Sequence, residues 1–131
     1  STDESRFVLN GIYFSLKENK LILVATDGRR LALASAPLEM RPVDRPRPAI
    51  VPAKGMHLFC RVIEDPLEQV HLHFGATQIG LKTKNAEIFA RLIDGDVVRQ
   101  NQRTSFRISQ AAHYVDASSR QFVDFFEQSF W

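Results

Sequence analysis

The sequence has little cysteine and no long apolar run, and both shortages narrow what the chain can be. Cys60 is the only cysteine among 131 residues, which excludes an internal disulfide framework and fits a reducing compartment. No apolar run approaches the roughly 18 residues that a membrane-spanning helix needs. Residues 1–4 are polar and acidic, without the basic-then-apolar order of a secretory signal. We therefore expect a cytoplasmic protein.

The sequence also lacks the short motifs of common catalytic and metal sites. It has no serine-centred nucleophile elbow, no glycine-rich phosphate loop and no paired-cysteine site. Asp27, next to Gly28, is explained by a turn. His71 and His73 share one face of an expected strand, but two imidazoles without a third nearby ligand are typical of surface residues. We therefore expect no enzymatic activity, no cofactor and no bound metal.

The length suits one domain, and the overall charge is nearly balanced. The chain is 44% apolar and 24% charged, close to the averages of soluble globular proteins. The formal net charge is +2, yet residues 29–61 hold seven Lys and Arg side chains against only Glu39 and Asp44. This local surplus predicts either a surface that faces polyphosphate or a solvated surface without a partner.

The apolar pattern predicts strands joined by turns, with one helix between them. The expected strands cover residues 6–16, 21–25, 31–34, 49–51, 70–74, 78–83 and 87–93. The proline-rich residues 36–48 predict an extended loop. Pro52 fits the first position of a helix that ends near Ile63. This order predicts an α+β fold in which helices pack on one face of antiparallel sheets.

The expected helix has an apolar face. Met56, Phe59, Cys60 and Ile63 recur at helical spacing, which predicts that they point toward the core. Cys60 is therefore interpreted as a core side chain and not as a reactive thiol.

One hairpin organises the chain: two apolar runs joined by Thr-Asp-Gly, which is strong turn chemistry. The turn presents Thr26, Arg29 and Arg30 at its rim, beside the apolar Leu9 and Leu31. A cationic, hydrogen-bonding rim next to leucines suits a peptide or a polyanion better than bond-breaking chemistry. The alternatives are that the leucines belong to the core and that the arginines are solvated.

Four segments resemble a known family: residues 6–11 (RFVLNG), 24–32 (VATDGRRLA), 50–54 (IVPAK) and 91–95 (RLIDG). Their order and spacing are similar to those of the middle domain of the bacterial DNA polymerase III beta subunit, the sliding clamp. The resemblance covers roughly residues 3–96. It implies the fold of a DNA-clamp domain, with antiparallel sheets and helices packed on one face.

The resemblance implies a binding function. Sliding clamps are rings of three similar domains per subunit, closed head to tail by two subunits around duplex DNA, and they tether polymerases. Basic side chains in the bore face phosphates, a contact that is sequence-independent and salt-sensitive. A pocket on the ring face receives short linear motifs of polymerases and the clamp loader as extended peptides. We therefore expect duplex DNA, such peptides and further copies of the chain as partners.

The matching positions also imply the site residues. For the wall of the peptide pocket these are Leu9, Thr26, Gly28, Arg29, Arg30 and Leu31. The leucines are expected to receive an apolar anchor, while the threonine and the arginines bond the peptide backbone or carboxylates. For the DNA side the residues are Arg6 and Phe7, in the loop-to-strand region that approaches duplex in the family.

The chain departs from the family pattern on both sides of the match. The family continues into a linker and a third domain that completes the peptide pocket, whereas residues 97–103 differ here. The family domain also has a strand and a helix ahead of the position of Arg6. We therefore divide the chain into a clamp-like body, residues 1–98, and a divergent tail, residues 99–131. The tail is expected to supply the missing strand and helix, either in the same chain, as in a circular permutation, or in a neighbouring copy by swapping.

The pattern of the tail fits that role. Residues 105–108 read as a strand, and Ser109 fits the cap of a helix over residues 110–115. A second helix is expected to carry four phenylalanines on one face, which need an apolar partner. These are Phe122, Phe125, Phe126 and Phe130.

Two functional classes remain open. The first is a DNA sliding-clamp-type processivity module in DNA replication that binds duplex DNA non-specifically, clamp-binding peptides, or both. The second is a truncated clamp-like interaction protein that does not encircle DNA and competes for clamp partners. The first class includes both a part of a ring and a fragment of one. A hexamer-sized species in solution supports a ring of single domains, whereas a monomer or dimer indicates a fragment or a competitor.

Overall fold

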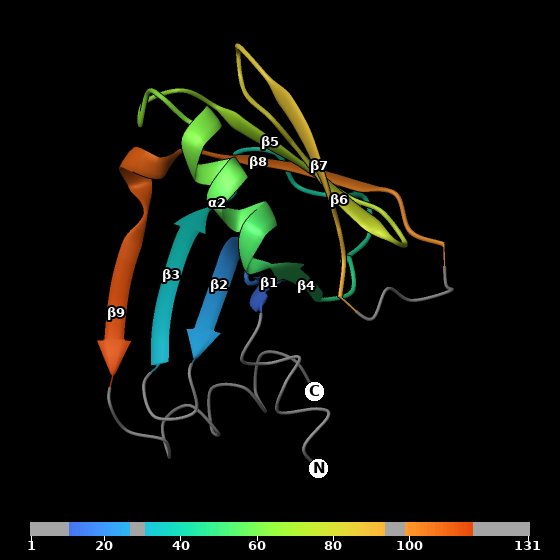
Figure 1. The fold of residues 1–131 in the computed structure, drawn as a ribbon, viewed down its shortest axis with the longest axis horizontal. Helices are drawn as coiled ribbons and strands as arrows, with labels where there is room; N and C mark the ends of the chain where they lie inside the picture. The colour runs from blue at the N-terminus through green and yellow to red at the C-terminus, as the bar shows by residue number, and fades with distance from the viewer. Residues whose placement is uncertain (1–10, 27–30, 94–98, 117–131) are drawn as a thin grey trace.

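The structure is a computed structural model that describes residues 11–26, 31–93 and 99–116 (Figure 1). The described strands form two antiparallel sheets. In the larger one, sheet A, the spatial order is β4-β1-β2-β3-β9. Its strands are β1 (Gly11–Lys17), β2 (Lys20–Thr26), β3 (Leu31–Pro37), β4 (Ala49–Pro52) and β9 (Ala112–Asp116).

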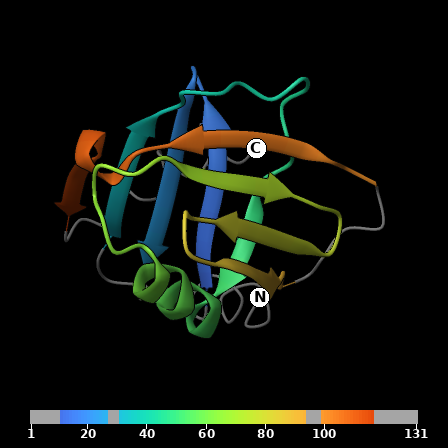
Figure 2. The same ribbon diagram turned by 90° about the horizontal axis from the view of Figure 1, so that it is seen from above.

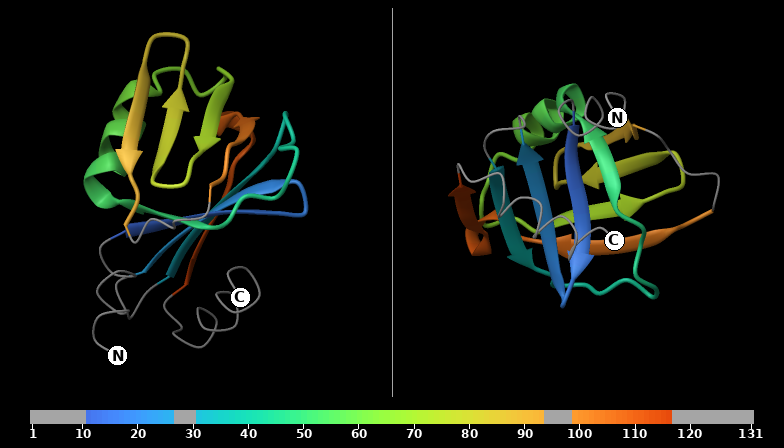
Figure 3. Two further views of the ribbon diagram at one scale, coloured as in Figure 1. Left: turned by 90° about the vertical axis from the view of Figure 1, so that its right-hand side faces the viewer. Right: turned by 90° about the horizontal axis from the view of Figure 1, so that it is seen from below.

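The smaller sheet, sheet B, crosses over sheet A, and helix α2 (Ala53–Val62) flanks both (Figures 2 and 3). Its spatial order is β7-β6-β5-β8. The strands are β5 (Val70–Phe74), β6 (Gln78–Lys82), β7 (Glu87–Arg91) and β8 (Gln102–Phe106). The predicted α+β class with antiparallel sheets is confirmed. Among the described residues, no helix has the length and apolar character to cross a bilayer.

A tight turn joins β1 to β2, as the sequence predicts. β1 and β2 are linked by Glu18 and Asn19, whose φ angles of 52° and 63° are left-handed. Two such residues in succession are typical of a type I′ hairpin turn. β2 and β3 pair antiparallel along their whole length, and their register ends at the pair Thr26 and Leu31. The expected Asp-Gly turn at residues 27–30 lies outside the described residues.

The main core lies between the inner faces of the two sheets and α2. Phe14 of β1 meets Phe59 of α2 edge to face, with ring centroids 6.4 Å apart and an interplanar angle of 74°. In β5 the side chains of Val70, Leu72 and Phe74 are buried, whereas those between them are more exposed. This alternation confirms the expected half-buried strand, and it fixes which face of sheet B packs on sheet A.

Helix α2 follows Pro52, which is its N-cap and not its first helical residue. The buried stripe of the helix runs through Gly55 and Phe59, one turn apart. Cys60 lies about 100° further around the helix than Phe59, and its side chain is exposed. The prediction that Cys60 belongs to the core is therefore wrong, because the stripe is narrower than the sequence pattern indicates.

The last described residues build strands in both sheets. β8 pairs with β5, and β9 pairs with β3. The helix expected over residues 110–115 is wrong: Ile108–Gln110 form a single 3-10 turn, η1, and β9 follows it. The physical reason is tertiary: as a strand, β9 pairs with the backbone donors and acceptors along the edge of β3. The expected second helix with the phenylalanines lies outside the described residues.

The proline-rich loop between β3 and β4 is irregular, as predicted, although residues 36 and 37 of the predicted loop belong to β3. Hydrogen bonds tie the loop to the segment around β8. These bonds join Glu39 N to Ser105 O at 2.8 Å, Thr104 Oγ1 to Met40 O at 2.6 Å, Asp44 N to Gln102 Oε1 at 2.8 Å and Arg47 N to Gln100 Oε1 at 2.8 Å. Because prolines remove backbone donors from this loop, it forms only a single bridge to a strand, between Met40 and Ser105, and the hydrogen bonds above hold the rest of it.

Candidate functional site

The hairpin end is the described part of the predicted peptide pocket. Thr26 and Leu31 face each other there as register partners, and Thr26 is half-buried. Leu31 is only 2% exposed and packs in a cluster with Tyr13 and Val24. In this conformation Leu31 is thus a core side chain. Its predicted contact with a peptide stays a prediction.

This cluster covers the face of sheet A that points away from the main core. Along β1, Tyr13 contributes to the cluster and its neighbour Phe14 to the main core, because successive side chains point to opposite faces. The buried members are Tyr13, Ile22, Val24 and Leu31, with Leu33 and Ile50 packed against them. Sheet A is therefore apolar on both faces. This second face extends to Thr26 at the hairpin end, where the sequence predicts that the apolar anchor of a peptide binds.

The remaining predicted site residues lie outside the described residues. For the peptide pocket these are Leu9, Gly28, Arg29 and Arg30, and for the DNA side Arg6 and Phe7. Their roles stay predictions that follow from the resemblance of their segments.

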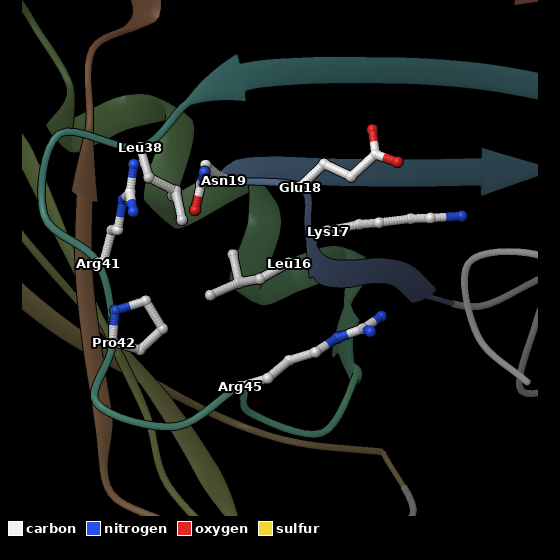
Figure 4. Close-up of a pocket in the computed structure, with 8 residues that line it drawn as sticks. All are labelled: Leu16, Lys17, Glu18, Asn19, Leu38, Arg41, Pro42 and Arg45. Atoms are coloured by element: carbon white, nitrogen blue, oxygen red, sulfur yellow. The ribbon is translucent and has the colours of Figure 1, made fainter.

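Part of the basic surplus gathers around one cleft of about 230 Å³ at the β1–β2 turn (Figure 4). Lys17, Arg41 and Arg45 line it, together with Glu18 and apolar side chains that include Leu16. In Figure 4 the side chain of Arg41 extends toward Asn19, whereas those of Lys17 and Arg45 extend toward the opposite side of the view. The cations thus spread over a surface and do not converge on one point, which suits an extended polyanion better than a single small anion.

His71 and His73 lie on one face of β5, as predicted. Nε2 of His73 is within hydrogen-bonding distance of Asn101 Oδ1. Within the described ranges, no group of three or more His, Cys, Asp or Glu side chains is placed to hold a metal ion.

A second cleft, of about 460 Å³, lies over sheet B and was not predicted from the sequence. Its lining includes Phe89 of β7 and Arg103 of β8, which the sequence separates but the sheet brings to one surface. The alternation of inward-facing and outward-facing residues along β5 and β7 was the signal from which this outer face could have been predicted. The sequence alone did not reveal which strands are neighbours.

Residues 1–97 match the family described as DNA polymerase III beta subunit, central domain. The Beta sliding clamp of Bacillus subtilis is 35% identical over 96 residues, which make up 73% of this chain and 25% of that protein. The Beta sliding clamp of Staphylococcus aureus is 33% identical over 95 residues, 72% of this chain and 25% of that protein. The chain thus spans about a quarter of the length of these relatives.

Solved structures agree with the sequence relatives. The crystal structure of the Bacillus subtilis sliding clamp has a TM-score of 0.61 at 35% identity, covering 75% of this chain and 26% of that one. The Pseudomonas aeruginosa sliding clamp, bound to griselimycin, has a TM-score of 0.62 at 31% identity, covering 71% and 25%. Strands β8 and β9 lie beyond residue 97, where the family match ends. The chain belongs to the DNA polymerase III beta subunit family, whose central domain matches its residues 1–97.

Proposed function

We propose that this chain acts as a sliding-clamp-type module in DNA replication, one that binds duplex DNA without sequence preference and docks short peptides of polymerases and the clamp loader. The β2–β3 hairpin carries this proposal, because the segment that resembles the peptide-binding wall of the family, residues 24–32, includes the end of β2 and the start of β3. The peptide lies along the hairpin end, with its apolar anchor toward Leu31 and its backbone bonded by Thr26 and the arginines that follow. The role is binding and not catalysis, and the compartment is the cytoplasm.

For DNA, the proposed contact is electrostatic. Lys17, Arg41 and Arg45 at the cleft of Figure 4 are further basic side chains, in addition to Arg6, which is predicted to contact DNA. Contacts between such side chains and phosphates are independent of base sequence, and they weaken steeply as salt rises.

We propose further that the tail, residues 99–131, replaces structure that the family has ahead of the matched region. The pairing of β8 with β5 and of β9 with β3 supports this, since one segment beyond the family match contributes to both sheets. The boundary between body and tail at residue 98 is then a boundary of sequence resemblance and not of folding.

Fluorescence titration with a labelled clamp-binding peptide tests the peptide-binding role. We expect saturable binding that is weaker than binding to a complete clamp, because the third domain of the family completes the pocket. Arg30→Gln should weaken binding, whereas Arg45→Gln, which changes the same charge at the cleft of Figure 4, should not. Binding as tight as that of a complete clamp, or equal effects of both substitutions, would refute the assignment.

The second candidate function is a competitor that binds clamp partners without encircling DNA. It is favoured by β9, which occupies the edge of β3 and so prevents another subunit from pairing there. The mass in solution decides between the two. A hexamer-sized species supports a ring of single domains, whereas a monomer or dimer supports the competitor.

A further inference from the structure

Sheet B has one face in the core and one face open to solvent. The inward face carries the buried side chains of Leu72, Ile79 and Ala90, from β5, β6 and β7. Because strand side chains alternate, the residues between them form the outer face. The register aligns a row across all four strands of this face: Arg103 of β8 opposite His73 of β5, then Gly80 of β6, then Phe89 of β7.

Phe89 is the aromatic member of this row, and 51% of its surface is exposed. A Cβ atom at Gly80 would lie 2.8 Å from Cε1 of the Phe89 ring, which means that the ring leans over the backbone of β6. The absence of a side chain at Gly80 makes this close approach possible. The ring is therefore supported on one side by the sheet and remains accessible to solvent.

The face is also hollowed. The cleft of about 460 Å³ lies over the row, and Met40, from the loop after β3, also lines it. Met40 is held in place because its carbonyl oxygen accepts a hydrogen bond from Thr104 Oγ1 and its backbone bridges to Ser105. This volume is within the usual range of ligand sites.

The charged side chains of the face are mainly cationic. Lys82 and Arg103 line the cleft, and Arg91 extends the positive charge along β7. His71 and His73 also line the cleft. Among the described residues that line it, Glu87, which lies opposite Lys82 in the register of β6 and β7, is the only acidic one. The face thus complements a ligand with several negative charges.

We propose that the outer face of sheet B binds single-stranded nucleic acid, with Phe89 stacking on a base and Lys82 and Arg103 contacting phosphates. An exposed ring on an antiparallel sheet that also carries Lys82, Arg91 and Arg103 can bind the two features that a single strand offers, unstacked bases and a charged backbone. A duplex hides the faces of its bases and leaves the ring without a partner. This proposal goes beyond the proposed function, which concerns duplex DNA and peptides.

Fluorescence anisotropy with short labelled oligothymidylate and oligouridylate, on the full chain, tests the site. Phe89→Ala should weaken binding about tenfold or more, the usual effect of losing one base–aromatic stack, and Phe89→Tyr should keep the affinity. Lys82→Gln combined with Arg103→Gln should flatten the dependence of log K on log salt by about 1.4, roughly 0.7 for each lost phosphate contact. Leu67→Ala, at an exposed apolar position outside the cleft, is the matched control.

Circular dichroism and thermal unfolding of each variant confirm that the fold is intact before affinities are compared. Binding of either oligonucleotide that requires the ring of Phe89 supports the proposal. Three results would overturn it: equal affinity of wild type and Phe89→Ala, a matching duplex that binds as tightly with the same dependence on Phe89, or displacement of the oligonucleotide by an acidic peptide at similar concentration. The last result would identify the face as a peptide-docking surface.

Discussion

Thr104→Val should destabilise the whole protein, although Thr104 lies beyond the family match. Thr104 is in β8, is 0% exposed, and donates from Oγ1 to the carbonyl oxygen of Met40 at 2.6 Å. Valine has the same shape, so the substitution removes the hydrogen bond without opening a cavity. Leaving a partly buried carbonyl without its partner costs about 1–3 kcal/mol of the free energy of unfolding.

Urea unfolding followed by far-ultraviolet circular dichroism measures this loss as a lower midpoint at unchanged slope. Thr104→Ser is the control, since it keeps the hydroxyl and loses only a methyl group, worth about 0.8 kcal/mol. Hydrogen exchange distinguishes the loss of the hydrogen bond from the loss of the methyl group. The amide of Glu39, which donates to Ser105 O, should exchange faster in Thr104→Val and as in wild type in Thr104→Ser.

Unchanged unfolding of Thr104→Val would show that β8 is an appendage and that the body folds without it. An equal increase of exchange in both variants would show that shape, and not the hydrogen bond, holds the loop.

The remaining predictions concern α2. Phe59→Ala should lower the free energy of unfolding by about 3–5 kcal/mol, while Leu58→Ala, at the exposed neighbouring position, should change it by less than about 0.5 kcal/mol in the same urea assay. Gly55→Ala should cost about 1–2 kcal/mol, because its Cβ would lie 2.8 Å from Cβ of Ala90, and adding Ala90→Gly should recover part of that loss in a double-mutant cycle. Cys60, being exposed, should react with a thiol reagent in the folded protein at the rate of the unfolded chain, and protection of the thiol would contradict its placement.

The fold could be predicted from the sequence wherever local pattern and tertiary environment agree. The alternation of Val70, Leu72 and Phe74 gave the right strand, and Pro52 marked the start of the right helix. The failure at residues 110–115 has a different origin. Their local pattern favours a helix, but pairing with the edge of β3 stabilises residues 112–116 as a strand, and no local signal reports that edge.

The candidate sites were predictable only in part, for the same reason. The hairpin with Thr26 and Leu31 is a local feature, and its pairing followed from turn chemistry. The burial of Leu31 depends on Tyr13 and Val24, which the register brings together. The cleft over sheet B combines residues from β5 to β8 with Met40, so it exists only once the order of the strands is known.

The pairing of β3 with β9 has a consequence for synthesis of the chain on the ribosome. Ser35 of β3 pairs with Ala112 of β9. While the ribosome synthesises the residues between them, the edge of β3 therefore has no partner strand. An unpaired edge of this kind is a template for wrong partners, including a neighbouring nascent copy. We therefore expect misassembly of the protein to begin on polysomes, where several nascent copies of the chain lie close together.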